Sequence, residues 1–436
     1  MLWRFMGQSE SDTGNTPAAA EEHDPYAVLR NRDFVFYLVG RFVASVGQQM
    51  LTVAVGWELY ELTRSARALG LVGLTQMVPM VLFTLPAGHV ADNYSRKRII
   101  ILMTFVVACA SVGLTLIPAR PDAVGWIYLC LFVTGTARTF LWPASSAFLP
   151  RLVSRQQFPR AVTWNSGSFQ LSSVAGPAAG GAIIALTGKA GPVYAVNAAT
   201  SLICLLLIQF VRRDNVVAVK EKLTLANLIV GFKFVFASPI ILGTITLDMF
   251  AVLLGGATAL LPVYAKEILN VGASGLGFLQ AALPLGSVFC ALILAHRPPL
   301  QKAGRALLWA VITFGVATIG FGLSRWFPLS FLMMFICGAV DNVSVVVRHT
   351  LVQLLTPDEK RGRVSAVNAL FIGTSNELGG AESGFVAQWF GPTIGNSVAT
   401  GAVISVVSGG IGTILVVIAV ALIWPQIRKY GRLDSA

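Results

Sequence analysis

The feature that most constrains this chain is its series of long apolar segments. A helix needs about 20 predominantly apolar residues to cross ~30 Å of hydrocarbon. The sequence contains twelve such segments, and we expect helices at 34–60, 69–91, 99–117, 124–148, 165–186, 192–211, 240–264, 275–295, 306–323, 328–354, 365–389 and 397–424. Only 12% of the residues are charged, against about 25% in soluble domains. Lipid must therefore surround most of the surface, and the expected fold class is an all-α integral membrane protein.

Positive charges in the short loops predict the orientation. Lys and Arg close to apolar segments stay on the cytoplasmic side of a membrane. Of the 32 Lys and Arg residues, 23 lie in the two tails and in the loops on the same side, whereas 6 lie in the other loops. Both termini are therefore expected in the cytoplasm of a bacterial inner (plasma) membrane. The net charge of +12 then reflects topology, and we expect no nucleic-acid partner.

The longest internal loop divides the twelve segments into two groups of six. We expect a polar cytoplasmic tail at 1–33, a six-helix bundle at 34–211, a cytoplasmic linker at 212–239, a second six-helix bundle at 240–424 and a tail at 425–436. Apolar residues of the linker recur at helical spacing, which predicts an amphipathic interfacial helix; a plain linker is the alternative. Two such halves around a site at the midplane are the arrangement from which alternating access is built.

Two short motifs suit a gate between helices. After the second segment, Gly88 permits close helix approach, Asp92 can face a helix N-terminus, and Arg96 can pair with an acid across the bundle. The fifth segment contains Gly176-Pro177-Ala-Ala-Gly180-Gly181, in which proline bends the helix and the glycines allow tight contact. Membrane anchoring by the basic cluster and ordinary helix packing are the respective alternatives.

These motifs resemble those of the major facilitator superfamily. The loop at 88–98 is similar to its signature loop, although Asn93 and Ser95 stand where Arg and Gly are usual. The fifth segment resembles the Gly-Pro-x-x-Gly-Gly motif of its antiporters, and 231–239, 277–286 and 351–363 resemble the branch of siderophore, macrolide and lysophospholipid transporters. The resemblance implies a twelve-helix fold of two pseudo-symmetric bundles, with gating by the residues of both motifs, Gly88, Asp92, Arg96, Gly176, Pro177, Gly180 and Gly181.

Polar side chains inside the apolar segments are candidates for substrate binding, because such groups usually face a bundle interior or a cavity. In the first segment, polar residues at helical spacing form one stripe, which consists of Arg41, Ser45, Gln48 and Thr52. We expect this stripe to line a central cavity in which Arg41 holds an anionic group; structural pairing of Arg41 is the alternative. Arg348, Asn368 and Ser375 complete the expected substrate-binding set.

Carboxylates inside the segments are candidates for proton coupling. Removal from water favours the neutral form of a carboxylic acid, so such a group can bind and release a proton. The candidates are Asp248, Asp341, Glu377 and Glu382, with Arg138 as a relay partner. Glu377 is the first choice because it lies nearer to mid-helix than Glu382, and a salt bridge is the alternative role for Asp248. Asp341 and Arg348 are roughly 10 Å apart along one helix, so we expect each to have a partner on another helix.

The predicted function is export of a siderophore or another amphiphilic small molecule by rocker-switch alternating access, driven by proton antiport. The arginines would suit an anionic substrate group. Alternatives are a multidrug or macrolide efflux pump, a lysophospholipid flippase, and a non-transporting sensor or scaffold. The sequence lacks a Gly-x-x-x-x-Gly-Lys-[Ser/Thr] phosphate loop and the His-Glu-x-x-His and Gly-x-Ser-x-Gly motifs. We expect no enzyme activity, cofactor or metal, and we expect a monomer whose partners are substrate, protons and lipid.

Overall fold

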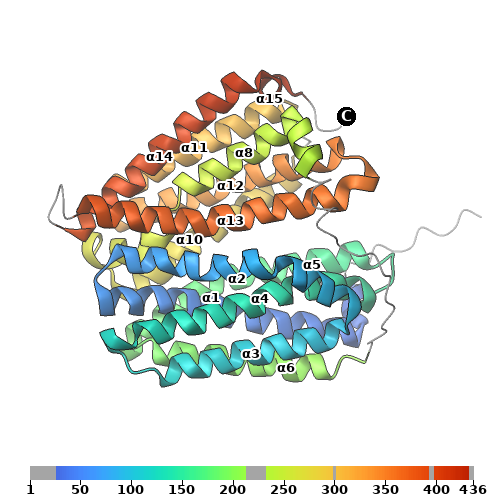
Figure 1. Ribbon diagram of the computed structural model, residues 1–436, viewed down its shortest axis with the longest axis horizontal. Coiled ribbons are helices and arrows are strands. Elements are labelled where there is room, and N and C mark those ends of the chain that lie inside the picture. The colour runs from blue at the N-terminus through green and yellow to red at the C-terminus, as the bar shows by residue number, and fades with distance from the viewer. Residues whose placement is uncertain (1–25, 213–231, 298–300, 392–396, 432–436) are drawn as a thin grey trace, which may run out of the picture.

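The computed structural model describes residues 26–212, 232–297, 301–391 and 397–431. Within these ranges the chain is helical and forms two bundles of six long helices (Figure 1). The first bundle contains α1 (Arg32–Thr63), α2 (Ala66–Asn93), α3 (Arg96–Leu116), α4 (Val124–Leu152), α5 (Phe158–Thr187) and α6 (Gly191–Gln209). The second contains α8 (Pro239–Leu254), α10 (Gly272–Ala295), α11 (Ala303–Leu323), α12 (Phe327–Leu355), α13 (Asp358–Phe390) and α14 (Val398–Ile423). The prediction of a twelve-helix, two-bundle fold is confirmed.

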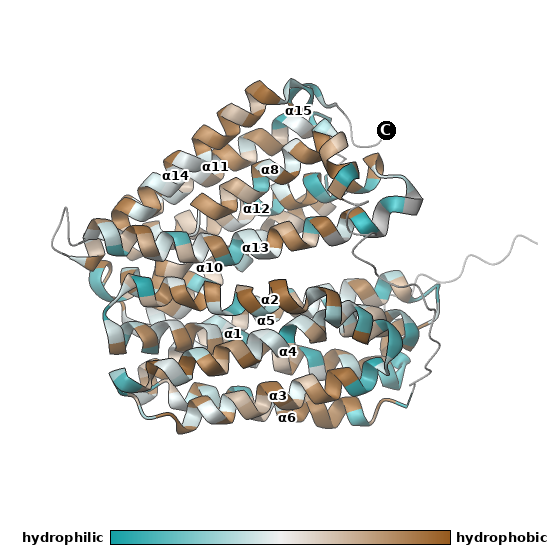
Figure 2. Cartoon of the chain, in the orientation of Figure 1, coloured by the Kyte–Doolittle hydropathy of each residue, from teal (hydrophilic) through white to brown (hydrophobic). Residues whose placement is uncertain are grey.

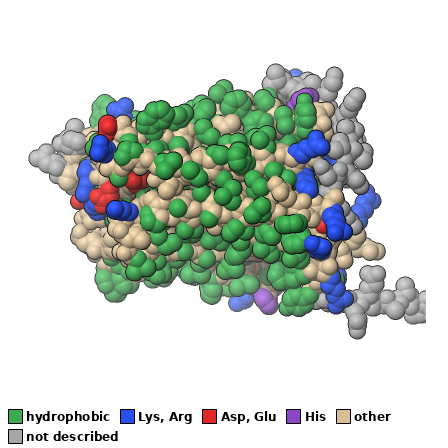
Figure 3. All heavy atoms as spheres, turned by 90° about the horizontal axis from the view of Figure 1, so that it is seen from below, with side chains coloured by type: hydrophobic (Ala, Val, Ile, Leu, Met, Phe, Trp, Pro, Cys, Tyr) green, Lys and Arg blue, Asp and Glu red, His purple; other side chains and the backbone are tan. Residues whose placement is uncertain are grey.

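The helices form an apolar belt with charged ends. Brown, apolar turns cover the middle of most helices in Figure 2. In Figure 3 a green apolar band separates a mainly blue end from an end where red and blue side chains mix. We call the end that holds Tyr26 and Gly431 the tail end and the opposite one the far end. This belt is what a bilayer requires of a protein that crosses it.

Helix α13 is the least apolar of the long helices. Eleven stretches in the described chain are long and apolar enough to cross a membrane, and α13 is not among them although it has 33 residues. Its polar residues Asn368 and Ser375 are buried inside the protein, and Asn376 and Glu377 face a cavity. Because these side chains avoid lipid, a polar helix is compatible with a place in the bundle.

The seventh predicted helix, at 240–264, is not continuous. Helix α8 ends at Leu254, and η3 (Ala257–Leu260), α9 (Leu261–Val263) and η4 (Tyr264–Ile268) follow. The break occurs at Gly255–Gly256, where a Cβ atom added at Gly256 would lie 2.3 Å from the Gly379 carbonyl oxygen. Pro262 also lacks the N–H group that would continue the helical hydrogen bonds. Close approach to α13 therefore breaks this element.

The linker between the bundles is described only at its ends. The predicted interfacial helix at 212–239 falls mainly on residues 213–231, which lie outside the described residues. The described part is helical at 232–237, and the Phe232 ring packs 5.9 Å from the Phe371 ring of α13. At the other end, the Arg212 backbone N–H donates to the Asp33 carboxylate at 3.1 Å.

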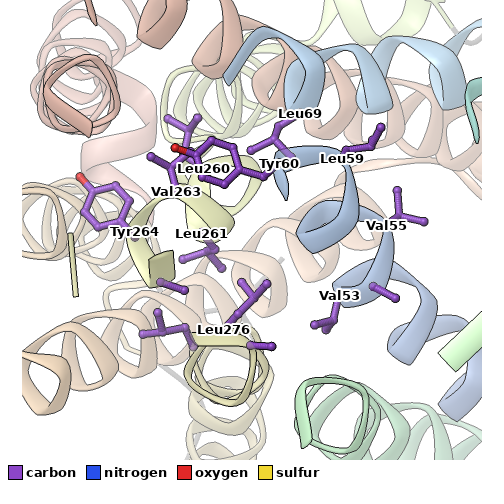
Figure 4. Close-up of a cluster of buried hydrophobic side chains, with 14 of the residues drawn as sticks. Val53, Val55, Leu59, Tyr60, Leu69, Leu260, Leu261, Val263, Tyr264 and Leu276 are labelled. Atoms are coloured by element: carbon purple, nitrogen blue, oxygen red, sulfur yellow. The ribbon is translucent and has the colours of Figure 1, made fainter. Parts of the chain in front are cut away.

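The two bundles meet along α2–α13 and α5–α10, where several glycines let the helices approach closely. A Cβ atom added at Gly384 would lie 2.6 Å from the Gly70 Cα atom, and one added at Gly277 would lie 2.4 Å from the Pro177 carbonyl oxygen. An apolar cluster joins the halves at the same level. Figure 4 shows its members from α1, α2, η3, α9, η4 and α10, namely Val53, Val55, Leu59, Tyr60, Leu69, Leu260, Leu261, Val263, Tyr264 and Leu276.

Candidate functional site

A cavity of about 540 Å³ lies between the two bundles. Its lining comes from α1, α2, α4 and α5 of the first bundle and from η3, α9, α10, α12 and α13 of the second. Phe169 lines the cavity and is 53% exposed, so the cavity is not fully enclosed.

The cavity wall combines apolar surface with uncharged amide groups. Its glutamines and asparagine come from both bundles and are Gln48, Gln49, Gln76, Gln170, Gln280 and Asn376. Side-chain amides both donate and accept hydrogen bonds. Pockets of about 300–1,000 Å³ with mainly apolar walls and a few polar groups are typical small-molecule sites. The cavity therefore has the size and chemistry to bind an amphiphilic small molecule.

Two opposite charges face the cavity from opposite bundles. Among the described residues that line it, Arg138 of α4 and Glu377 of α13 are the only ionisable ones. The Arg138 guanidinium donates to the Gln76 side-chain oxygen at 3.0 Å. Glu377 packs on α2 at Gly73, where an added Cβ atom would lie 2.5 Å from the Glu377 carbonyl oxygen and 3.4 Å from a carboxylate oxygen. Gly73 and Gln76 are one helical turn apart, so α2 holds both charges close to one another.

The far end is closed by ion pairs between the bundles. Arg64, at the end of α1, donates to Glu267 of η4 at 3.0 Å. Lys266 of η4 pairs with Glu61 of α1. Ser65 adds a hydrogen bond of 3.0 Å to Gln388 of α13. Together with the glycine contacts and the apolar cluster, these pairs seal the far end of the cavity.

The predicted polar stripe of α1 is divided by this geometry. Gln48 and Thr52 line the cavity, whereas Arg41 and Ser45 do not belong to its lining. Arg41 lies closer to the tail end and acts electrostatically on Arg138. Helical spacing places four residues on one face, but the cavity occupies only part of the length of that face.

Arg348 and Asp248 form an ion pair inside the second bundle and do not line the cavity. Both side chains are less than a tenth exposed. Asp341 and Ser344 of α12 line a small crevice that also contains Asp248. The expected partner of Arg348 on another helix is therefore Asp248 of α8.

The remaining polar candidates of α13 lie behind the cavity wall. Asn368 and Ser375 are buried, and the Ser375 hydroxyl donates to the Ile372 carbonyl oxygen at 3.0 Å. Glu382 accepts a hydrogen bond from the neighbouring Ser383 hydroxyl at 3.3 Å. The structure brings only Glu377 and Arg138, of the predicted proton-coupling residues, to the cavity itself.

The predicted gating loop lies at the tail end of α2. Arg96 Nε donates to the Ala91 carbonyl oxygen at 3.3 Å, and Asp92 and Arg151 lie close enough to act on Arg96 electrostatically. Lys97 donates to the Gln209 and Val211 carbonyl oxygens at 3.0 and 2.7 Å, where it binds the end of α6. The loop thus connects α2, α3 and α6 within the first bundle.

The glycines of the fifth-helix motif contact two different helices. Cβ atoms added at Gly176 and Gly180 would lie 2.5 Å from the Gln49 Cβ atom and 3.0 Å from the Met50 Cα atom of α1. One added at Gly181 would lie 2.5 Å from the Ala273 carbonyl oxygen of α10. Gly181 therefore contributes to the contact between the bundles, whereas the other two pack within the first bundle.

Sequence reasoning missed most of the amides and the ion pairs of the far end. Three of these amides are uncharged polar side chains within apolar segments, namely Gln76, Gln170 and Gln280. Their position inside apolar segments could have indicated that they face the cavity. Glu61 lies in the last turn of α1 and Lys266 lies in η4, about 200 residues further along the sequence. Nothing in their local sequence indicates that they pair.

This chain is similar to known proteins over most of its length. The Major Facilitator Superfamily model matches residues 37–380. Enterobactin exporter EntS of Escherichia coli is 26% identical over 393 residues, which cover 90% of this chain and 92% of the relative. EntS of Shigella boydii has the same identity and coverage.

Solved structures share the fold at low sequence identity. A bacterial homolog of the human lysosomal transporter Spinster, in an inward-facing and occupied conformation, has a TM-score of 0.73 and 14% identity, with 93% of this chain and 97% of that chain covered. The nucleoside transporter NupG has a TM-score of 0.69 and 12% identity, with coverage of 90% and 98%. At these identities the likeness shows the fold alone.

Proposed function

Because this chain belongs to the major facilitator superfamily, we propose that it exports an amphiphilic small molecule across the bacterial inner membrane by alternating access and performs no enzymatic reaction. The observation that carries the proposal is the cavity between the two bundles, whose amide groups and apolar surfaces come from both halves. A site shared by two rigid halves changes its exposure when the halves rock, and this is the basis of alternating access.

A siderophore is the first candidate substrate. The support is the similarity of this chain, over 90% of its length, to proteins named as enterobactin exporters. The cavity adds independent support for an amphiphile of moderate size, because its wall offers both apolar contacts and hydrogen-bonding groups. Drug-like amphiphiles would use the same features.

We propose proton antiport as the driving force, with Glu377 as the proton carrier. Glu377 faces the cavity, where both water and substrate can reach it. Asp248 is paired with Arg348 in the packed interior of the second bundle. Its carboxylate is therefore occupied by the Arg348 guanidinium and does not line the cavity. Glu377 is therefore the better placed of these two proton-coupling candidates.

Both termini are proposed to be cytoplasmic, which makes this conformation inward-facing. The basic tail end fits the positive-inside rule. The ion pairs and glycine contacts then close the periplasmic side of the cavity. In the opposite state the gating loop of α2 would close the cytoplasmic side.

Flux in proteoliposomes tests the proposal. Purified protein is reconstituted, an imposed proton gradient is applied, and movement of enterobactin is followed against protein-free vesicles. We expect transport that requires the gradient and is lost in Glu377→Gln. The matched control is Asp122→Asn, which removes an exposed carboxylate at a helix-connecting turn. Gradient-independent transport by both the parent and Glu377→Gln would contradict proton coupling.

A further inference from the structure

The charges that face the cavity restrict the kind of substrate that proton antiport can export. In antiport, binding of substrate and binding of the proton must oppose each other, and this opposition is reciprocal. Arg138 and Glu377 are the only ionisable residues among the described residues of the cavity lining. Whether substrate and proton oppose or favour each other's binding therefore depends on how the substrate interacts with the Glu377 carboxylate.

An anionic substrate would bind more tightly when Glu377 is protonated, which is the opposite of what antiport requires. Protonation of Glu377 removes the negative charge beside Arg138 and makes the cavity more positive. Arg41, which acts on Arg138 from the tail side, adds to that positive potential. Proton and anion would then favour each other's binding and would move together, because opposite charges attract strongly in a site removed from water. Such coupling gives symport and not antiport.

A substrate that donates a hydrogen bond to the Glu377 carboxylate would compete with the proton, as antiport requires. In the described part of the chain no side chain forms an ion pair or a hydrogen bond with the Glu377 carboxylate, so its oxygens are available to a ligand. Arg138 instead donates to Gln76 at 3.0 Å. Gly73 gives the Glu377 side chain the space to lie on α2 beside Gln76. A hydroxyl or ammonium group of a substrate would bind the ionised carboxylate and compete with the proton.

From these observations we propose that the cavity selects a neutral or cationic amphiphile that presents a hydrogen-bond donor to Glu377, and that it discriminates against anions. The amides of Gln48, Gln170, Gln280 and Asn376 bind the remaining polar groups. This inference rests on the proposed antiport. It departs from the anionic substrate expected from three arginines, since Arg41 and Arg348 lie outside the cavity lining.

Equilibrium binding of matched probes tests this inference without any flux. The probes are pyrene-butylamine, pyrene-butanol, pyrene-butyl methyl ether and pyrene-butanesulfonate, which differ only in the terminal group. Affinities are measured by tryptophan-to-pyrene energy transfer in nanodiscs of zwitterionic lipid, with protein-free nanodiscs subtracted. Titrations between about pH 8 and about pH 5 report the effect of protonating a carboxylate without neutralising the amine.

For the parent protein we expect the amine and the alcohol to bind more tightly than the ether and the sulfonate at the higher pH. Acidification should weaken amine binding by about tenfold or more and leave ether binding unchanged. In Glu377→Gln the amine should lose both its advantage and its pH dependence, while unchanged ether binding shows an intact cavity. Arg138→Gln should retain amine binding, and Asp122→Asn should behave as the parent.

Sulfonate binding as tight as amine binding in the parent, or an undiminished amine preference in Glu377→Gln, would overturn the inference. The two proposals fail separately. If the probes bind as expected and vesicle transport ignores the proton gradient, antiport is wrong and the charge selection stands. If transport requires the gradient and Glu377→Gln keeps the parental probe selectivity, the charge selection is wrong and antiport stands.

Discussion

At the scale of the residue, the ionisable groups inside the bundles fall into two environments. Asp248 and Arg348 neutralise each other in the packed interior of the second bundle. Glu377 and Arg138 face a shared cavity from opposite bundles, and Arg138 donates a hydrogen bond to Gln76. The first environment fixes charges in place, whereas the second leaves them available to ligands and protons. The presence of an acid within an apolar segment does not by itself distinguish these two environments.

The Asp248–Arg348 pair yields a stability prediction. Removal of one partner leaves a buried charge without compensation, which costs about 3–5 kcal/mol. We therefore expect Asp248→Asn to lower the thermal unfolding midpoint of the purified protein markedly. The double variant Asp248→Leu with Arg348→Met should regain most of that stability, because it removes both charges. A single variant as stable as the parent would show that the pair has no structural role.

At the scale of the element, small residues decide where the bundles touch. The motif of α5 was predicted to allow close contact, and its glycines do approach α1 and α10. Which glycine contacts which helix depends on the rotation of α5 about its axis, and the motif does not contain that information. In the same way, α13 remains in the bundle despite its polar residues because they point into the protein.

Gly181 yields a conformational prediction. Gly181→Leu places a side chain against the Ala273 carbonyl oxygen and should prevent closure of the far end. We expect a cysteine at Thr52, in a variant without the five native cysteines, to react about tenfold faster with an impermeant maleimide added on the far side. Gly167→Leu is the control on the same helix, since nothing lies within 4 Å of its added Cβ atom. Equal reactivity in both variants would argue against this contact as a gate.

At the scale of the whole molecule, the ends of the bundle differ in charge and in closure. The far end pairs acids and bases between the two halves, and the tail end is mainly basic. Each exposed pair is worth only about 0–1 kcal/mol. The pairs therefore bias the balance between conformations without locking it, which suits a transporter that must open on both sides.

Charge reversal in the far-end pairs should shift that balance. Lys266→Glu places like charges beside Glu61 and Glu267, so we expect faster far-side labelling of the Thr52 cysteine. Addition of Glu61→Lys should restore slow labelling, and high salt should reduce the effect because exposed charges are screened. If the double variant labels as fast as the single one, the pairing is not responsible.

The orientation itself can be tested with single cysteines. Asp122→Cys lies at a far-end turn and Arg297→Cys at the tail end of α10. In intact spheroplasts an impermeant maleimide should label the first and should reach the second only after the membrane is permeabilised. The reverse pattern would place both termini outside the cytoplasm.

The sequence by itself determined the number of long helices, the division into two bundles and the charge asymmetry of the ends. These properties follow from local apolar runs and loop charges, which a bilayer constrains strongly. It also identified Glu377, Arg138, Gln48 and Thr52 among the polar residues that now line the cavity.

Only the tertiary structure decided which charges pair and which remain available. Arg348 pairs with Asp248, and Glu61 pairs with Lys266. Glu377 instead lies beside Gly73 of α2. Partners from different helices are set by helix rotation and tilt, and these are determined by packing along the whole interface rather than by residues near each charge. The break after Leu254 likewise lies where Gly256 closely approaches α13 at Gly379.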